Sequence, residues 1–298
     1  MNGMTLTRRS ALALAGAALA GAAVRLPANR NIRWAVSANL WNALPDVPFT
    51  GILDVMRDTG FTGIRLTQFP GFLKKYDLTV ASLQKELAKR DCHAITLSFN
   101  APTHDPARRA EVLTAAKTAM EFLREFGADR LVVFSPNRSN LSEAAFKSMC
   151  ECFNRIGEAA GEMGFRAGLH NHMGQMVQTS EEVDRCMAMT DPRLFSLSPD
   201  TAHLYLAGCD VVKTLEKSKG RLMMADYKDA HKIADKWLDE ICDLGDGAVD
   251  FPGCHRVLKS IGYKGWVCVD LDAARQGPRV SYERCGKYIV ENLEPIYV

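Results

Sequence analysis

The chain has 298 residues, of which 47% are hydrophobic and 8% aromatic, with 37 Lys and Arg against 35 Asp and Glu. This length suits one large domain, because α/β barrels commonly reach roughly 250 residues as a single unit, and the apolar fraction excludes a disordered chain. A net charge of +2 gives no broad cationic surface, so nucleic acid is excluded as the expected partner.

The N-terminus has the composition of an export signal. Arg8 and Arg9 precede a run of Ala, Leu and Gly at residues 11–23, in which Ala20-Gly21-Ala22 offers a small-residue cleavage site. The run is shorter than the ~20 residues that a spanning helix needs, so no membrane span is expected in the mature form. The arginine pair resembles the twin-arginine signal, which predicts removal of residues 1–23 and a periplasmic or otherwise exported protein. The alternative is an ordinary buried N-terminal helix.

Nine cysteines are scattered along the chain, and an odd number cannot all pair internally. Several lie in apolar runs, as Cys268 does, and Cys150 and Cys152 have no partner pair at zinc-finger spacing. We therefore expect mostly buried, reduced cysteines. Twin-arginine export of an already folded protein is compatible with unpaired thiols.

Short β-rich runs alternate with longer amphipathic stretches from about residue 30 to the C-terminus. The expected strands are residues 33–37, 63–67, 94–99, 130–134, 166–170, 195–200, 222–226 and 266–270. The expected helices are residues 49–59, 80–90, 106–126, 142–163, 180–189, 210–219, 251–261 and 280–293. Alternation at this spacing indicates parallel β/α units, so residues 30–298 are expected to form a single-domain α/β fold, a (β/α)8 TIM barrel. A doubly wound open sheet is the alternative, but no G-x-G-x-x-G or P-loop follows any expected strand.

Acidic and imidazole side chains follow the last four expected strands, and in a barrel the strand C-termini surround the active site. These residues are His170, Asp200, Asp226 and Asp270. Singly, each could be a core histidine or a helix cap; together they are costly to bury unless they are paired or bind a metal. The set predicts one divalent metal. One nitrogen and three carboxylates favour Mn²⁺, Mg²⁺ or Fe²⁺, with Mn²⁺ first, and leave Zn²⁺ and Co²⁺ open.

Longer motifs surround these residues. They are His170-Asn171-His172-Met173-Gly174, Val177-Gln178-Thr179, Asp200-Thr201-Ala202-His203, Lys228-Asp229 and Gly245-Asp246-Gly247-Ala248-Val249-Asp250-Phe251. On these motifs the chain resembles the xylose isomerase-like barrel superfamily of sugar isomerases and epimerases, and within it the inosose dehydratase branch. The resemblance covers essentially the whole mature chain. It implies a metal-dependent enzyme acting on a keto-sugar or polyol ketone.

The ligand positions depart from the family pattern, which usually places Glu, Asp, His and Glu after strands five to eight. Of the four matching residues here, only Asp200 keeps the usual type. In epimerases of this superfamily the two Glu also act as opposed proton-transfer bases. The resemblance therefore implies that His170 and Asp270 take these catalytic roles, or that His172 substitutes.

Five further residues are candidates for substrate binding. They are Trp41, His104, His203, Lys228 and Arg275. Lys228 matches the family's substrate-site lysine, and Arg275 is placed to neutralise an anion. Core packing is the alternative for Trp41, and a surface loop is the alternative for His104. The charged run at residues 225–239 is interpreted as a solvated loop and helix.

Two classes of function stay open. In the first, a base removes a proton next to a carbonyl while a metal stabilises the enediolate. Return of the proton gives isomerisation or epimerisation, and loss of a β-substituent gives dehydration or lyase cleavage. The second class is a sugar-binding barrel with a degenerate site and no turnover. Both classes take a small-molecule sugar or polyol as partner, and a homo-oligomer stays open.

Overall fold

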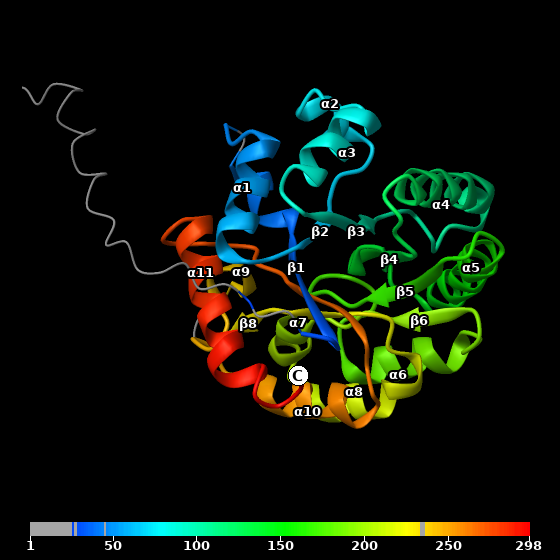
Figure 1. The fold of residues 1–298 in the computed structure, drawn as a ribbon. Coiled ribbons are helices and arrows are strands. Elements are labelled where there is room, and N and C mark those ends of the chain that lie inside the picture. The colour runs from blue at the N-terminus through cyan, green and yellow to red at the C-terminus, as the bar shows by residue number, and fades with distance from the viewer. Residues whose placement is uncertain (1–25, 27–28, 45, 233–235) are drawn as a thin grey trace, which may run out of the picture.

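The computed structural model describes residues 26, 29–44, 46–232 and 236–298, so the expected export signal at residues 1–23 lies outside the described residues. Eight parallel strands curl into a ring (Figure 1). They are β1 (Ile32–Ser37), β2 (Gly63–Leu66), β3 (His93–Phe99), β4 (Arg130–Phe134), β5 (Arg166–His170), β6 (Phe195–Leu197), β7 (Ala225–Tyr227) and β10 (Gly265–Val269).

Strand pairing confirms the predicted barrel. The hydrogen-bonded order is β6-β5-β4-β3-β2-β1-β10-β7, and every pair in it is parallel. Two isolated parallel bridges, from Leu197 to Leu222 and from Asp200 to Asp226, join the two ends of this order and close the ring. A short antiparallel hairpin of β8 (Asp229–Ala230) and β9 (Ile241–Cys242), which we did not expect from the sequence, follows β7.

The long helices form a layer outside the ring (Figure 1). The α-helices are α1 (Phe49–Thr59), α2 (Gly71–Lys75), α3 (Val80–Ala88), α4 (Arg109–Arg124), α5 (Glu143–Glu162), α6 (Ser180–Met189), α7 (Thr201–Leu206), α8 (Val211–Ser218), α9 (Trp237–Glu240), α10 (Phe251–Ser260) and α11 (Pro278–Tyr288). Short 3-10 helices occupy Ala38–Ala43, Pro106–Arg108, Arg138–Asn140 and Lys219–Arg221, and a π-helix, Ile289–Leu293, extends α11. Local sequence sets the helix starts: at α6, Thr179 and Glu182 form a reciprocal capping box.

Alternating side chains of β1, β4 and β10 divide between two apolar clusters. Along β10, Trp266 and Cys268 belong to a small cluster of eight residues, whereas Val267 and Val269 join the large cluster that includes the helices. This alternation places the small cluster inside the ring. Gly63 belongs to the same inner layer, because a Cβ there would lie 2.6 Å from the Trp266 ring.

The start of the barrel is tied to the end of the chain. The side-chain amide of Asn29 donates to Glu294 Oε2 at 2.9 Å and to the Tyr297 carbonyl at 2.8 Å. The amide of Asn31 donates to the Val298 carbonyl at 2.7 Å. These bonds reinforce the pairing of β1 with β10, which joins the first strand to the last.

Two further expectations concern membrane and redox state. Among the described residues, no helix combines the length and the apolarity required to cross a bilayer. All nine cysteines are free, and seven of them are buried, as expected.

Candidate active site

A cavity of about 410 Å³ opens at the C-terminal ends of the strands. Its charged and imidazole lining consists of Arg65, His170, His172, Lys228, Asp270 and Asp272. Its uncharged polar lining consists of Asn39, Asn42, Thr67, Gln68, Ser98 and Asn100, and Phe69 and Phe134 complete the wall. The cavity therefore offers hydrogen-bonding groups and aromatic faces around a strongly charged region.

Three of the four predicted metal ligands lie together beside this cavity. One ligand atom from each of His170, Asp200 and Asp270 lies within 4.8 Å of the other two. His170 Nε2 is 3.6 Å from Asp200 Oδ2, and all three side chains are at most 1% exposed. We call these three residues the inner group.

Asp226, the fourth predicted ligand, lies behind His170. His170 Nδ1 donates a hydrogen bond to Asp226 Oδ2 at 2.9 Å, because an ionised carboxylate can only accept. The proton on Nδ1 leaves the lone pair on Nε2, the atom that faces Asp200. A carboxylate in this position orients a metal-binding histidine and raises its basicity.

The inner group fits a divalent cation. Among the described residues, His170 Nε2 and Asp270 Oδ1 are buried and accept no hydrogen bond. Asp200 Oδ2 is buried as well and lies 3.1 Å from the Lys228 ammonium. Buried polar atoms without hydrogen-bond partners are expensive unless another group satisfies them. A divalent ion bound by one nitrogen and carboxylate oxygens would satisfy His170 Nε2 and Asp270 Oδ1 and could also bind Asp200 Oδ2.

Arg65, which sequence reasoning missed, reaches into the site from β2. Its Nη1 lies 2.7 Å from Asp226 Oδ2, and its Nη2 lies 2.6 Å from Asp270 Oδ2. Nη2 also donates to Ser37 Oγ at 3.1 Å. The guanidinium is therefore a buried fork that bridges two carboxylates from different strands.

Lys228 is the second buried cation. Its Nζ lies 3.1 Å from Asp200 Oδ2, 3.0 Å from Asp270 Oδ2 and 2.7 Å from Asp272 Oδ2. The side chain is 1% exposed, so the interpretation of residues 225–239 as solvated is wrong at this position. Carboxylates from separate strand ends surround the ammonium, which makes its burial tolerable.

Burial and the two cations set the protonation of the inner group. Burial, reinforced by Arg65, lowers the pKa of His170 to about 3, so the imidazole is neutral at physiological pH. Burial alone would raise the pKa of Asp270, but Arg65 and Lys228 together hold it below its ordinary value. Asp270 is therefore an anion that is hard to protonate.

Acidic groups outnumber the cations that face them. The carboxylates are Asp200, Asp226, Asp270 and Asp272, against the two cations Arg65 and Lys228. Burial, together with the neighbouring Asp270, raises the pKa values of Asp200 and Asp226 despite these cations. The excess of negative charge is a further feature that a divalent cation would offset.

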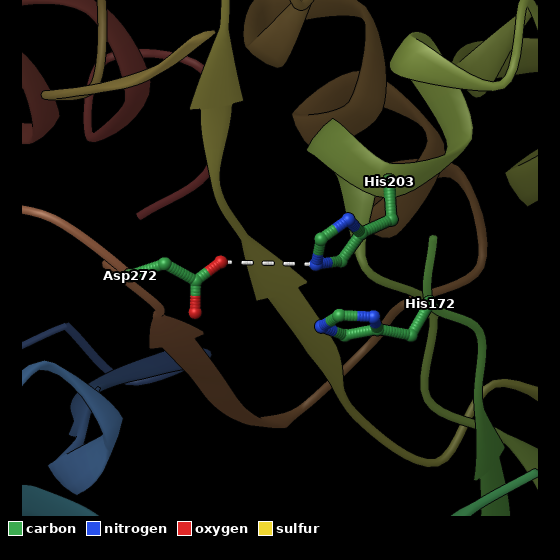
Figure 2. Close-up of side chains that lie close together, drawn as sticks. All are labelled: His172, His203 and Asp272. Carbon is green, nitrogen blue, oxygen red and sulfur yellow. Dashed lines mark ion pairs between the residues drawn. The ribbon is translucent and has the colours of Figure 1, made fainter. Parts of the chain in front are cut away.

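A second cluster, which we call the outer group, lies beside the inner group (Figure 2); His172 and Asp272 line the cavity, whereas His203 is fully buried. It consists of His172, His203 and Asp272, each with one atom within 4.8 Å of the others. The two imidazole centroids are 3.7 Å apart, and His203 Nε2 is 3.8 Å from Asp272 Oδ2. His172 Nδ1 donates to the Met173 carbonyl at 2.7 Å, so its lone pair is on Nε2.

Lys228 links the outer group to the inner one. Its ammonium can only donate, so it donates to His203 Nε2 at 3.2 Å. Asp272, which the sequence analysis did not single out, also accepts from the side-chain amide of Asn39. The only sequence signal for Asp272 was its position two residues after Asp270, on the same side of an extended chain.

The other predicted substrate residues lie apart from this cavity. Trp41 is 1% exposed and stacks on Tyr282 with a centroid distance of 5.5 Å, so it has the core packing that was its alternative. His104 is not among the lining residues. Arg275 lines a separate pocket of about 190 Å³, together with Arg284.

Asp229 explains the glycine-rich motif at residues 245–251. Its carboxylate accepts hydrogen bonds from the backbone N–H groups of Gly245, Gly247 and Val249 at 2.9 to 3.1 Å. Gly245 has a φ of +90°, and a Cβ there would lie 2.3 Å from the Tyr288 ring. The motif is thus a loop held on Asp229, directly after Lys228.

Comparisons with known proteins agree with the barrel fold. The sequence profile of the family described as "Xylose isomerase-like TIM barrel" matches residues 53–285. The inosose dehydratase of Bacillus velezensis is 28% identical over 283 residues, covering 85% of this chain and 92% of that protein. The inosose dehydratase of Bacillus licheniformis is 31% identical over 281 residues, covering 84% of this chain and 90% of that protein. A crystal structure of the IolI protein with a bound zinc atom has a TM-score of 0.74 at 17% identity, covering 89% of this chain and 99% of that one.

Proposed function

The chain belongs to the xylose isomerase-like TIM barrel family, and from this premise we propose that it is a metal-dependent dehydratase of an unphosphorylated keto-sugar or polyol ketone. Its similarity to inosose dehydratases over most of both chains supports the reaction and the substrate class. The observation that carries the proposal is the convergence of His170, Asp200 and Asp270 beside the cavity.

In this proposal the inner group holds one divalent ion, which when bound acts as a Lewis acid toward the substrate carbonyl and its enediolate. The donor set of one imidazole and two carboxylates supports Mn²⁺ as the ion. The zinc bound to the structurally similar IolI protein makes Zn²⁺ the alternative.

The lining of the cavity supports a neutral, polyhydroxylated substrate. The two lining cations, Arg65 and Lys228, are both engaged by carboxylates. Neither of these lining cations is therefore left to form an ion pair with a phosphate. The amide and hydroxyl groups of the wall can hydrogen-bond to sugar hydroxyls, and Phe69 and Phe134 can pack against a ring.

His172 is the proton acceptor in this proposal. Its Nε2 carries the lone pair, it lines the cavity, and burial followed by Lys228 lowers its pKa, so it is neutral. Asp270 is a poorer base because Arg65 and Lys228 hold its pKa low. His170 has its lone pair directed toward Asp200 and the metal position. The proton that His172 removes leaves with the β-hydroxyl as water.

Isomerisation or epimerisation is the second candidate. It begins with the same removal of a proton next to the carbonyl. The neutral imidazole of His203, which lies beside His172, favours it. Burial lowers the pKa of His203 well below its ordinary value, and the two rings are 3.7 Å apart. A second imidazole could return the proton to another carbon or face of the substrate.

Incubation of the Mn²⁺-loaded protein in D₂O with an inosose and a panel of unphosphorylated ketoses, followed by NMR, tests the proposal. Dehydration predicts loss of a hydroxyl and an unsaturated or diketone product. Incorporation of solvent deuterium into a sugar that keeps all its hydroxyl groups would instead establish isomerase or epimerase activity. Bound Mn²⁺ without exchange on any substrate would overturn the proposal and favour a sugar-binding barrel.

We propose further that the chain is exported through the twin-arginine route to the periplasm. Arg8, Arg9 and the short apolar run at residues 11–23 support this localisation.

A further inference from the structure

We propose that the positive charge of Arg65, a permanent part of the metal site, weakens the binding of a divalent ion there. The same charge stabilises the site when no ion is bound. This inference rests on the proposed metal at His170, Asp200 and Asp270, and it concerns what sets the affinity for that metal rather than the reaction.

The position of Arg65 makes it a cross-link inside the ring. In the sheet order, β1 and β10 separate β2 from β7. Arg65 nevertheless contacts Asp226 of β7 at 2.7 Å and Asp270, directly after β10, at 2.6 Å. The side chain therefore crosses the interior of the ring, with its fork shared between the two carboxylates.

These contacts occupy oxygen atoms that would otherwise face a metal. Asp270 Oδ2 is shared by Arg65 at 2.6 Å and Lys228 at 3.0 Å, so only Oδ1 is left without a partner among the described residues. Asp226 Oδ2 is shared by Arg65 and His170 Nδ1. A metal in the inner group would thus bind an Asp270 that already has two cationic partners.

Simple electrostatics predicts the direction of the effect. An ion bound to Asp270 Oδ1 would lie on the order of 5 Å from the guanidinium, and a divalent and a unit charge at that separation repel each other enough to lower affinity roughly ten-fold even at the dielectric constant of water. Inside the protein the repulsion is larger. Loss of the positive charge at Arg65 should therefore tighten metal binding.

A purely structural role predicts the opposite direction. If Arg65 served only to orient Asp226, and through it His170, its loss would loosen the ligand and weaken binding by about 10–100-fold, as is typical of groups behind a metal ligand. The hydrogen bond from His170 Nδ1 to Asp226, at 2.9 Å, does not require Arg65. We therefore expect the charge effect to dominate.

The same contacts predict the behaviour of the site without an ion. Removal of Arg65 leaves two buried carboxylates whose charge is opposed, among the described residues, mainly by Lys228, the His170 N–H group and the Cys268 thiol. Unpaired buried charges are strongly destabilising. The apo protein should therefore lose thermal stability, and added metal should restore more of it than in the wild type.

The test is Mn²⁺ binding by isothermal titration calorimetry on full-length wild type, Arg65→Gln and Arg65→Lys, with Tm measured without and with saturating Mn²⁺. Glutamine keeps an amide donor for Asp270 but removes the charge, and lysine keeps the charge. Arg130→Met is the matched control, because Arg130 begins β4, at the opposite end of the ring, and pairs with Asp129.

We expect Arg65→Gln to bind Mn²⁺ at least about ten-fold more tightly than the wild type, with a lower apo Tm and a larger rise of Tm on adding Mn²⁺. Arg65→Lys and Arg130→Met should bind within a few-fold of the wild type. If Arg65→Gln can be purified only with Mn²⁺ present, its Mn²⁺ affinity is measured by competition with a chelator. The expected result is again binding at least about ten-fold tighter than that of the wild type. Equal or weaker binding by Arg65→Gln overturns the inference and leaves the proposed metal intact, whereas a wild type that binds no Mn²⁺ overturns the proposed metal itself.

Discussion

The carboxylate of Asp226 accepts a hydrogen bond from Nδ1 of His170 at 2.9 Å, with both side chains fully buried. This bond fixes the tautomer of the imidazole and turns its other nitrogen toward Asp200, 3.6 Å away. In the proposed metal site, Asp226 would therefore act through His170 rather than as a ligand of its own.

Replacing Asp226 by Asn should weaken Mn²⁺ binding by about 10–100-fold, because a neutral amide is a poorer acceptor for the His170 N–H and orients the ring less firmly. Asp200→Asn, which alters a proposed ligand, should weaken binding more. Calorimetric titration of both variants with Mn²⁺ checks the order. Equal losses in the two variants would mean that Asp226 binds the metal directly.

His172→Gln should lower kcat by about 10²–10⁴-fold, the range typical of the loss of a general base. Its Mn²⁺ affinity should stay within a few-fold of the wild type, because His172 is not in the inner group. Steady-state kinetics with the best ketone substrate, and wash-in of solvent deuterium, measure the effect. Deuterium exchange at the wild-type rate would assign the base to another residue.

The sequence predicts most of the strands and less of the site. Predicted and observed bounds agree within one residue for six of the eight barrel strands, because their apolar cores and flanking glycines are local signals. The sixth strand stops at Leu197 instead of residue 200. Pro199 cannot donate to the ladder there, and Asp200 caps α7 by accepting from the His203 N–H. The ring is completed at this point only by isolated bridges.

Arg65, which the sequence analysis missed, and the burial of Lys228, which it named only as a substrate-binding candidate, show which part of the site was not predictable. Each is a lone basic residue in a short segment, and such residues are usually solvated. Their burial depends on carboxylates that lie between 28 and 205 positions away in the sequence, such as Asp270 for both. Only the closed ring brings these charges together, so no local pattern reports them.

Replacing Asp229 by Ala should destabilise the protein by about 2 kcal/mol, since the N–H groups of Gly245, Gly247 and Val249 lose their acceptor and only some of them can turn to water. Urea unfolding at neutral pH measures the change. Asp246→Ala, which removes an exposed ion pair with Arg284 in the same loop, is the control and should cost less than about 1 kcal/mol. If Asp229→Ala lowers the free energy of unfolding no more than Asp246→Ala does, Asp229 does not anchor the loop.

His255 should contribute acid sensitivity to folding. Burial lowers its pKa from 6.5 to about 4, and the ring contacts the Tyr227 hydroxyl and stacks on Trp34. Because the unfolded histidine takes up a proton near pH 6.5 and the folded one does not, this contribution is complete above pH 6.5 and is lost as pH falls toward 4. The shift corresponds to about 3 kcal/mol.

Urea unfolding of the wild type and of His255→Gln at pH 7.5 and pH 4.5 measures this contribution. Other groups titrate in both proteins, so the difference between the two pH dependences isolates His255. The wild type should lose about 3 kcal/mol more on acidification than the variant. Parallel losses would show that folding does not lower the pKa of His255.

The proposed export predicts a strict dependence on the arginine pair. Replacing both Arg8 and Arg9 by Lys should retain the protein inside the cell, although positive charge is conserved, because the twin-arginine signal is read as a pair of guanidinium groups. Fractionation of cells that carry the system, followed by immunoblotting, measures the distribution. A periplasmic fraction unchanged by the substitution would rule out this route.

The bonds from Asn29 and Asn31 to the carbonyls of Tyr297 and Val298 have a consequence for biosynthesis. A chain synthesised from its N-terminus can form its early β/α units one after another, but β1 gains its second neighbour only when β10 (Gly265–Val269) has been made. Closure of the ring is therefore a late step of folding, and one edge of the first strand stays unpaired until then.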